Sequence, residues 1–165
     1  MRALVALTFL AAGALFAQID TVEVKLSWKP IEFLFGDWTA TGGGAGTEAN
    51  HSNGAGEFSF HPELNGQIVT RKNFAEYKNG EPRHDDLMII YAETGQNTMR
   101  AIYFDSEGHT IRYIVKSPSA NVVVFESEPA PGPTYKLVYE LHGNQLDGKF
   151  EVGGRTYLTW SSVRK

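Results

Sequence analysis

The chain has 165 residues, about the length of one domain, and its 15 Lys and Arg against 19 Asp and Glu leave a formal net charge of −4. A mildly acidic chain without a Lys/Arg cluster is a poor nucleic-acid binder, because neutralising phosphates takes several neighbouring cations. The lack of cysteine excludes disulfides, thiolate metal sites and cysteine nucleophiles. Hydrophobic residues at 42% and aromatic residues at 12% exclude an intrinsically disordered chain.

Residues 1–17 have the pattern of a secretory signal peptide. Arg2 precedes an uncharged run of small and apolar residues that extends to Ala17. The run is short for a membrane span, and a basic start, an apolar centre and small final residues are typical of a signal. We expect cleavage near Ala17, or after Ala14 at a stricter site, and a periplasmic or secreted product without stable membrane insertion. An uncleaved anchor or a buried helix is the alternative.

A short helical turn precedes the main body of the chain. Pro30 suits the first turn of a helix. Ile31, Leu34 and Phe35 then fall on one apolar face at helical spacing. The segment 28–35 is therefore predicted to form one or two helical turns that lie against a hydrophobic surface.

The chain after this turn has the pattern of successive strands. Runs of alternating polar and apolar residues are separated by turn signals rich in Gly, Asn and Pro. Alternation is clearest where Tyr135, Leu137 and Tyr139 share one face. The ten predicted strands cover residues 37–41, 56–61, 67–77, 86–93, 98–105, 109–116, 121–127, 134–142, 145–152 and 155–164.

The tight turns between these strands predict antiparallel, up-and-down pairing. A flat sheet would leave two exposed edges, and closing it into a barrel removes them. The predicted fold is all-β, a single up-and-down antiparallel β-barrel of about ten strands. This barrel forms a domain over residues 31–165, after an N-terminal extension at 18–30. A β-sandwich is the alternative. The glycine-rich residues 42–46 are expected to form a flexible loop at the mouth of the barrel.

Residues 33–38, Phe-Leu-Phe-Gly-Asp-Trp, resemble the first-strand signature of the calycin superfamily, which joins lipocalins, fatty-acid-binding proteins and nitrobindin-like barrels. The resemblance implies that Trp38 closes one end of the barrel and packs against an arginine of the last strand, here Arg164. It also implies that Gly36 permits the sharp entry into the first strand. Later segments, including residues 103–108, resemble a bacterial lipocalin-like family of unknown function.

A closed barrel of this size can hold one small ligand. Tyrosine hydroxyls that face inward would suit an apolar or amphipathic molecule, because a buried phenol needs a partner. An inward-facing arginine would fit the carboxylate of a fatty-acid-like or other acidic ligand in bidentate geometry, whereas an outward-facing arginine would be an ordinary solvated residue. Alternation does not decide which candidates face inward, since both faces of the middle strands are partly apolar. The candidate ligand-binding residues are Arg71, Arg100, Arg112, Tyr91, Tyr103, Tyr113 and Tyr139.

Two other functions stay open. An isomerase-like or cyclase-like barrel enzyme would need one acid or base, for which Tyr91, Tyr103, Tyr113 and Glu140 are candidates on fold analogy alone. A filled barrel would serve as an interaction module. The sequence singles out no catalytic residue.

No cofactor or metal is predicted. Haem-binding nitrobindin-like relatives use a histidine close to the C-terminus, and residues 156–163 contain none. The segment His84-Asp85-Asp86 is expected to be a solvated turn rather than a metal site. The oligomeric state is left open.

Overall fold

The computed structural model of the chain describes residues 27–45, 56–76, 82–93 and 98–165. The proposed signal segment lies outside these residues. Within them, no helix has the length and apolar character needed to span a membrane. The elements are η1 (Lys29–Leu34), a 3-10 helix, and the strands β1 (Gly36–Ala45), β2 (Gly56–Glu63), β3 (Ile68–Ala75), β4 (His84–Ala92), β5 (Met99–Asp105), β6 (Thr110–Ser119), β7 (Val122–Ser127), β8 (Tyr135–His142), β9 (Gln145–Val152) and β10 (Arg155–Arg164).

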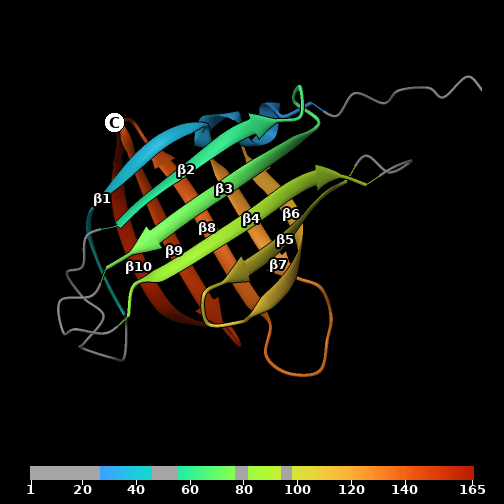
Figure 1. Cartoon of the computed structure of the whole chain (residues 1–165), viewed down its shortest axis with the longest axis vertical. Coiled ribbons are helices and arrows are strands. Elements are labelled where there is room, and N and C mark those ends of the chain that lie inside the picture. The colour runs from blue at the N-terminus through green and yellow to red at the C-terminus, as the bar shows by residue number, and fades with distance from the viewer. Residues whose placement is uncertain (1–26, 46–55, 77–81, 94–97) are drawn as a thin grey trace, which may run out of the picture.

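The ten strands form one closed barrel (Figure 1). Each strand pairs antiparallel with the next along the chain, and β1 also pairs with β10. This closure leaves no open sheet edge among the described strands, which is the physical reason for preferring a barrel. The predicted all-β, up-and-down barrel is confirmed, and the sandwich alternative is excluded.

Four strands, β1, β2, β4 and β6, extend beyond their predicted bounds, and two of these cases are informative. The loop expected at residues 42–46 is wrong for residues 42–45, which belong to β1 and pair with β10. Glycine suits this stretch, because a Cβ on Gly43 would lie only 2.9 Å from the Cβ of Trp160. In the second case, β6 continues past Pro118 to Ser119, and its pairing register with β7 shifts at this point.

Aromatic side chains form a cluster in the middle of the barrel. Tyr139 is fully buried, and its ring lies 5.5 to 6.3 Å from the rings of Phe58, Phe60, Phe125 and Trp160, measured between centroids. Most of these pairs meet edge to face, the arrangement that the aromatic quadrupole favours. The residues come from four different strands, β2, β7, β8 and β10, so this cluster joins opposite walls of the barrel.

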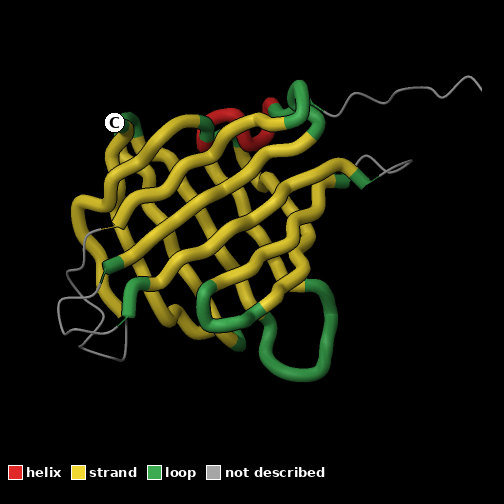
Figure 2. Tube along the Cα trace, in the orientation of Figure 1, coloured by secondary structure: helices red, strands yellow, loops and turns green. Residues whose placement is uncertain are grey.

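One end of the barrel, where β1 starts and β10 ends, is covered by η1 and is called the helix end (Figure 2). Ile31 and Leu34 of η1 are fully buried against the core, as the predicted apolar face requires. The Trp38 indole N–H donates to the carbonyl of Leu34 at 2.8 Å. The Ser117 hydroxyl donates to the carbonyl of Pro30 at 3.2 Å. The predicted helical turn is therefore present as a 3-10 helix tied to two strands.

Arg164 completes the helix end. Its guanidinium carbon lies 4.4 Å from the ring centroid of Trp38. The guanidinium also donates to the carbonyls of Phe35 and Phe33, and so fixes the entry into β1. Gly36 has φ +114°, and a Cβ there would lie 2.8 Å from an Arg164 nitrogen. This position thus needs glycine both for its backbone conformation and for the room that Arg164 occupies.

Candidate functional site

The opposite end of the barrel, where β3 ends at Ala75, β4 starts at His84 and β5 ends at Asp105, is called the far end. The longer loop between β7 and β8 also lies there, away from η1 (Figure 2). Four inward-facing side chains near the helix end are fully buried, namely Val69, Ile90, Val123 and Leu146. Those near the far end are only half-buried, namely Tyr103, Ile111, Tyr135 and Phe150. These four side chains are therefore partly exposed to solvent at the far end.

Strand register divides the seven predicted ligand-binding residues into two sets. The inward-facing set is Arg71, Tyr103, Tyr113 and Tyr139. The outward-facing set is Arg100, Arg112 and Tyr91, because their chain neighbours Ala101, Tyr113 and Ile90 are the buried ones. On the outer face Arg100 bonds Glu93 and Glu128, each at 2.9 Å. These last three residues do not line the interior.

Inside the barrel, Arg71 forms a buried ion pair with Asp86. Both side chains are about 95% buried, at 5% and 4% exposure, and Asn73 donates to the second Asp86 oxygen at 2.7 Å. Burial by itself disfavours the charged guanidinium, but the adjacent Asp86 carboxylate raises the pKa of Arg71 overall. The guanidinium also lies 5.8 Å from the ring centroid of Phe58. Arg71 is therefore charged but already neutralised by the protein.

Three inward-facing tyrosines surround this pair. Burial raises the pKa of Tyr139 to about 12, and burial also raises the pKa values of Tyr103 and Tyr113. All three phenols are therefore protonated at neutral pH and offer O–H donors. Tyr103 uses its hydroxyl to donate to Asp105 at 3.2 Å.

Two donors inside the barrel make no well-formed hydrogen bond within the described part of the chain, although the Arg71 guanidinium and the Tyr139 hydroxyl lie near enough to influence each other's pKa. They are the Arg71 Nε–H and the Tyr139 hydroxyl, and the Ser162 hydroxyl in the wall is a third. A buried donor without a partner costs about 1–3 kcal/mol, so such atoms are rare in folded proteins. The protein thus keeps hydrogen-bonding capacity at the centre of its barrel that its own described groups do not use.

A second group of polar side chains surrounds His84 at the far end. Its Nδ1 lies 3.0 Å from a Glu107 oxygen, and its Nε2 lies 3.4 Å from an Asp86 oxygen and 3.2 Å from the Tyr103 hydroxyl. The bond to Asp86 above all, followed by the bond to Glu107, raises the pKa of His84 to about 9. The imidazole is therefore protonated at neutral pH when the site holds no other cation.

The turn between β5 and β6 adds more ligand-type groups. Asp105 accepts the backbone N–H groups of Glu107 and His109 at 3.0 and 2.9 Å, and it bonds the His109 ring at 2.9 Å. Burial opposes the charge on Asp105, but these bonds from His109 and Glu107 lower its pKa overall. The backbone N–H of Ser106 donates to the carbonyl of Asp85 at 2.9 Å, which ties the turn to β4.

The solvated turn expected at His84-Asp85-Asp86 is wrong. These residues start β4, where His84 pairs with Ala75 and Asp86 pairs with Asn73. His84 and Asp86 therefore share the inward face, while Asp85 points outward. The alternating pattern of His84 and Asp86 could have indicated a strand. Their meeting with Arg71 and with the β5–β6 turn depends on strand register, which the local sequence does not show.

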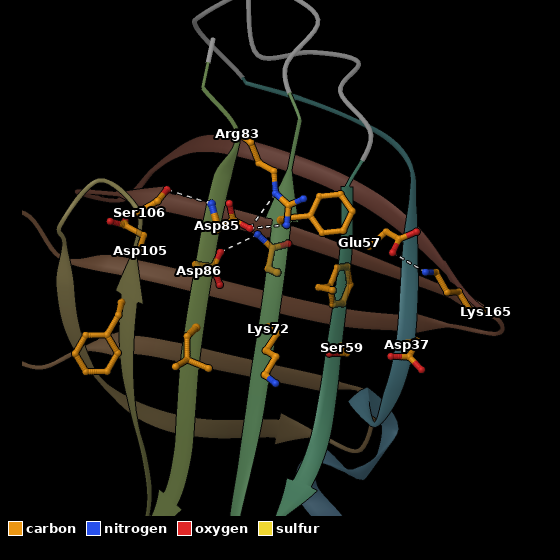
Figure 3. Close-up of a pocket in the computed structure, with 15 residues that line it drawn as sticks. Asp37, Glu57, Ser59, Lys72, Arg83, Asp85, Asp86, Asp105, Ser106 and Lys165 are labelled. Carbon is orange, nitrogen blue, oxygen red and sulfur yellow. Dashed lines mark hydrogen bonds and ion pairs between the residues drawn. The ribbon is translucent and has the colours of Figure 1, made fainter. Parts of the chain in front are cut away.

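A broad open hollow of about 550 Å³ lies over the outer surface of β1 to β5 (Figure 3). Its floor follows the cross-strand row Asp37, Ser59, Lys72, Leu87 and Phe104, which faces away from the interior. Asp85, Asp105 and Ser106 line it where it reaches the far end (Figure 3). The hollow therefore borders the His84 cluster but differs from the space inside the barrel.

Comparisons with known proteins assign no family to the chain. No protein-family model matches it, and no curated protein matches it either. The closed ten-stranded barrel is compatible with a calycin-like fold.

Proposed function

We propose that this chain is an exported calycin-like protein that holds a small apolar or amphipathic molecule inside its barrel. The observation that carries this proposal is the pair of unpartnered buried donors, Arg71 Nε and the Tyr139 hydroxyl, in an interior that is otherwise largely aromatic. Binding sites of this kind combine an apolar lining with a few polar groups that orient the ligand. The half-buried rings at the far end supply a path from solvent.

The charges inside the barrel indicate the polar group of the ligand. Asp86 already neutralises Arg71, and the three inward phenols are protonated. A carboxylate would add an unbalanced charge to this interior, which is costly in a low dielectric. A carbonyl, ester or hydroxyl oxygen would accept from the free donors without that cost. The polar end of the ligand is therefore an uncharged acceptor rather than an acid.

Two further features support the calycin-like assignment and export. The 3-10 helix leads directly into β1, and Arg164 of the last strand lies over Trp38, as the resemblance implies. Export is supported by the signal-like residues 1–17. N-terminal sequencing of the protein from a cell fraction outside the cytoplasm should find Gln18 as the first residue. Intact protein that stays in the cytoplasm would contradict export.

Ligand binding is tested by native mass spectrometry and by titration of the purified protein with a long-chain alcohol, its methyl ether and the fatty acid of equal length. We expect saturable 1:1 binding, with the uncharged molecules bound more tightly than the acid. The substitution Tyr139→Phe should weaken the alcohol complex about fivefold, the value of one hydrogen bond of about 1 kcal/mol.

The same substitution should leave the free energy of unfolding of the ligand-free protein unchanged or higher, because the Tyr139 hydroxyl has no partner there. Tyr157→Phe, at a tyrosine that is 39% exposed, is the matched control and should change neither quantity. No saturable binding of any of the three molecules would refute the proposed function. Unchanged affinity in Tyr139→Phe would refute the assigned polar contact.

A further inference from the structure

The far end holds a set of side chains with the composition of a metal site. One nitrogen of His84 and one oxygen each of Asp105 and Glu107 all lie within 4.8 Å of one another. We propose that these three residues bind one divalent first-row transition-metal ion. Zinc bonds to nitrogen and oxygen measure about 2.0–2.2 Å, so in a tetrahedral site the ligand atoms need to approach to within about 3.5 Å of one another. Glu107 can make this adjustment because its side chain is 58% exposed.

The charge of the cluster calls for a cation. With the imidazoles neutral, Asp86, Asp105 and Glu107 bring three negative charges to the neighbourhood of His84. Arg71 supplies one positive charge, and it is bonded to Asp86. Two carboxylates beside His84 are thus left for a divalent ion to neutralise, while Asp86 stays with its arginine.

The side chains proposed to bind the metal ion are held in place before any ion binds. Asp105 is only 5% exposed and is fixed by two backbone N–H donors. His109 bonds the other Asp105 oxygen, which is the way that second-layer groups orient metal-binding carboxylates. His84 is 17% exposed and starts a strand rather than a loop. Little ordering entropy therefore opposes binding, and only Glu107 has to be fixed.

The donor set indicates the class of metal. One imidazole and two carboxylates favour ions such as Zn²⁺, Fe²⁺ or Mn²⁺ over the soft ions that need thiolates. Among these ions Zn²⁺ should bind most tightly, because a given nitrogen and oxygen site generally has a higher affinity for Zn²⁺ than for Fe²⁺ or Mn²⁺. Three protein ligands leave a further coordination position open, at the end of the barrel that solvent reaches.

The metal site and the proposed ligand site can be tested separately. The site near Tyr139 uses Arg71 and the aromatic interior, whereas the metal ligands belong to β4 and the β5–β6 turn. The full chain is stripped with EDTA, dialysed and titrated with Zn²⁺ in a calorimeter. Co²⁺ serves as a second probe, because its visible absorption reports nitrogen and oxygen ligation. We expect one Zn²⁺ per chain and a rise in Tm on binding.

Single substitutions identify the ligands. Glu107→Gln and His84→Gln should each weaken Zn²⁺ binding at least about 100-fold, and His109→Gln about 10-fold as an orienting residue. Glu107→Gln is the safest variant, because an exposed side chain changes without loss of packing. His142→Gln is the matched control, since this histidine also lies beside two carboxylates, Glu140 and Asp147, and it should bind Zn²⁺ like the unmodified chain.

A 1:1 Zn²⁺ complex that is lost in Glu107→Gln and kept in His142→Gln would establish the site. Three results would overturn it: no Zn²⁺ or Co²⁺ binding at millimolar concentration, binding that Glu107→Gln leaves unchanged, or equal losses in Glu107→Gln and His142→Gln. Because Tyr139→Phe should leave Zn²⁺ affinity unchanged, failure of the ligand proposal would not be mistaken for failure of this one.

Discussion

The two ends of the barrel differ in the burial of their side chains and in the polar groups that they carry. At the helix end, Trp38 and Leu34 are buried, and the polar atoms of Trp38 and Arg164 bond to backbone carbonyls. At the far end, half-buried aromatic rings stand beside His84 and several carboxylates. One end is packed with buried apolar side chains, and the other is polar, titratable and more exposed to water.

This difference separates stability from binding. Buried apolar side chains with satisfied hydrogen bonds stabilise the closed barrel at the helix end. Ionisable groups in a partly dry setting are costly to the fold and are typical of functional sites. The Arg71–Asp86 pair lies between the two regions, and its charges hold the polar interior together. Substitutions at the two ends should therefore have effects of different kinds.

The largest effect is expected where the polar region enters the core. Asp86→Ala leaves Arg71 charged and buried without a partner, and should lower the free energy of unfolding by about 3–5 kcal/mol in urea titrations. The double substitution Arg71→Met with Asp86→Leu should recover most of this loss. Glu126→Ala, which breaks two ion pairs on the outer face, with Lys116 and Lys136, should cost less than about 1 kcal/mol. A small effect of Asp86→Ala would contradict a buried ionic pair.

The next largest loss of stability is expected at the helix end, from the substitution Gly36→Ala. An alanine at this position would have to adopt φ +114°, and its Cβ would displace Arg164 from the carbonyl of Phe35. We expect a loss of about 2–3 kcal/mol, measured as the change in unfolding free energy. Gly132→Ala is the control, because Gly132 has φ +112° but no atom within 4 Å of its Cβ position. Equal losses in the two variants would show that Arg164 contributes nothing at Gly36.

The smallest effect concerns pH and the far end. The pKa of His84 rises from 6.5 unfolded to about 9 folded, because Asp86 and Glu107 bond the charged ring. Its contribution to stability is fully present below pH 6.5 and is lost as the pH rises through 9. Solvent screens this half-buried ring, so we expect a loss of roughly 1–2 kcal/mol.

The measurement compares unfolding free energies of metal-free protein at pH 6 and at pH 9.5, in the unmodified chain and in His84→Gln. Other titrating groups contribute to the pH dependence of both proteins. The difference between the two pH dependences therefore reports the contribution of His84. Tyr103 and Asp105 stay unchanged in the variant and provide the same background. An identical pH dependence in the two proteins would rule out a raised His84 pKa.

Sequence patterns predicted the strands of the barrel better than they predicted which side chains face its interior. Turn signals placed all ten strands, and the bounds of β9 and β10 agree with the prediction at both ends. The Gly42–Gly44 stretch misled because glycine in a loop and glycine under a tryptophan look alike in sequence. Pro118 misled in the same way, since a strand can pass a proline where its register shifts.

The candidate site was only partly predictable. Arg71 and Tyr139 were identified as candidates, but so were Arg100 and Tyr91, which lie on the outer face. A shift of one residue in register reverses the face of every side chain in a strand, and the middle strands are apolar on both sides. The His84 cluster was missed for a related reason, because its members come from two strands and a turn.

The sequence by itself determined the strand order and the antiparallel pairing, because alternation and tight turns are local properties of the chain. The packing of Trp38 against Arg164 was expected only from the resemblance to calycins. Only the tertiary structure decided that Arg71 meets Asp86 inside and that His84 meets Asp105 and Glu107 at the far end. Those meetings follow from the register between neighbouring strands, which is set by packing over the whole barrel rather than by any one segment.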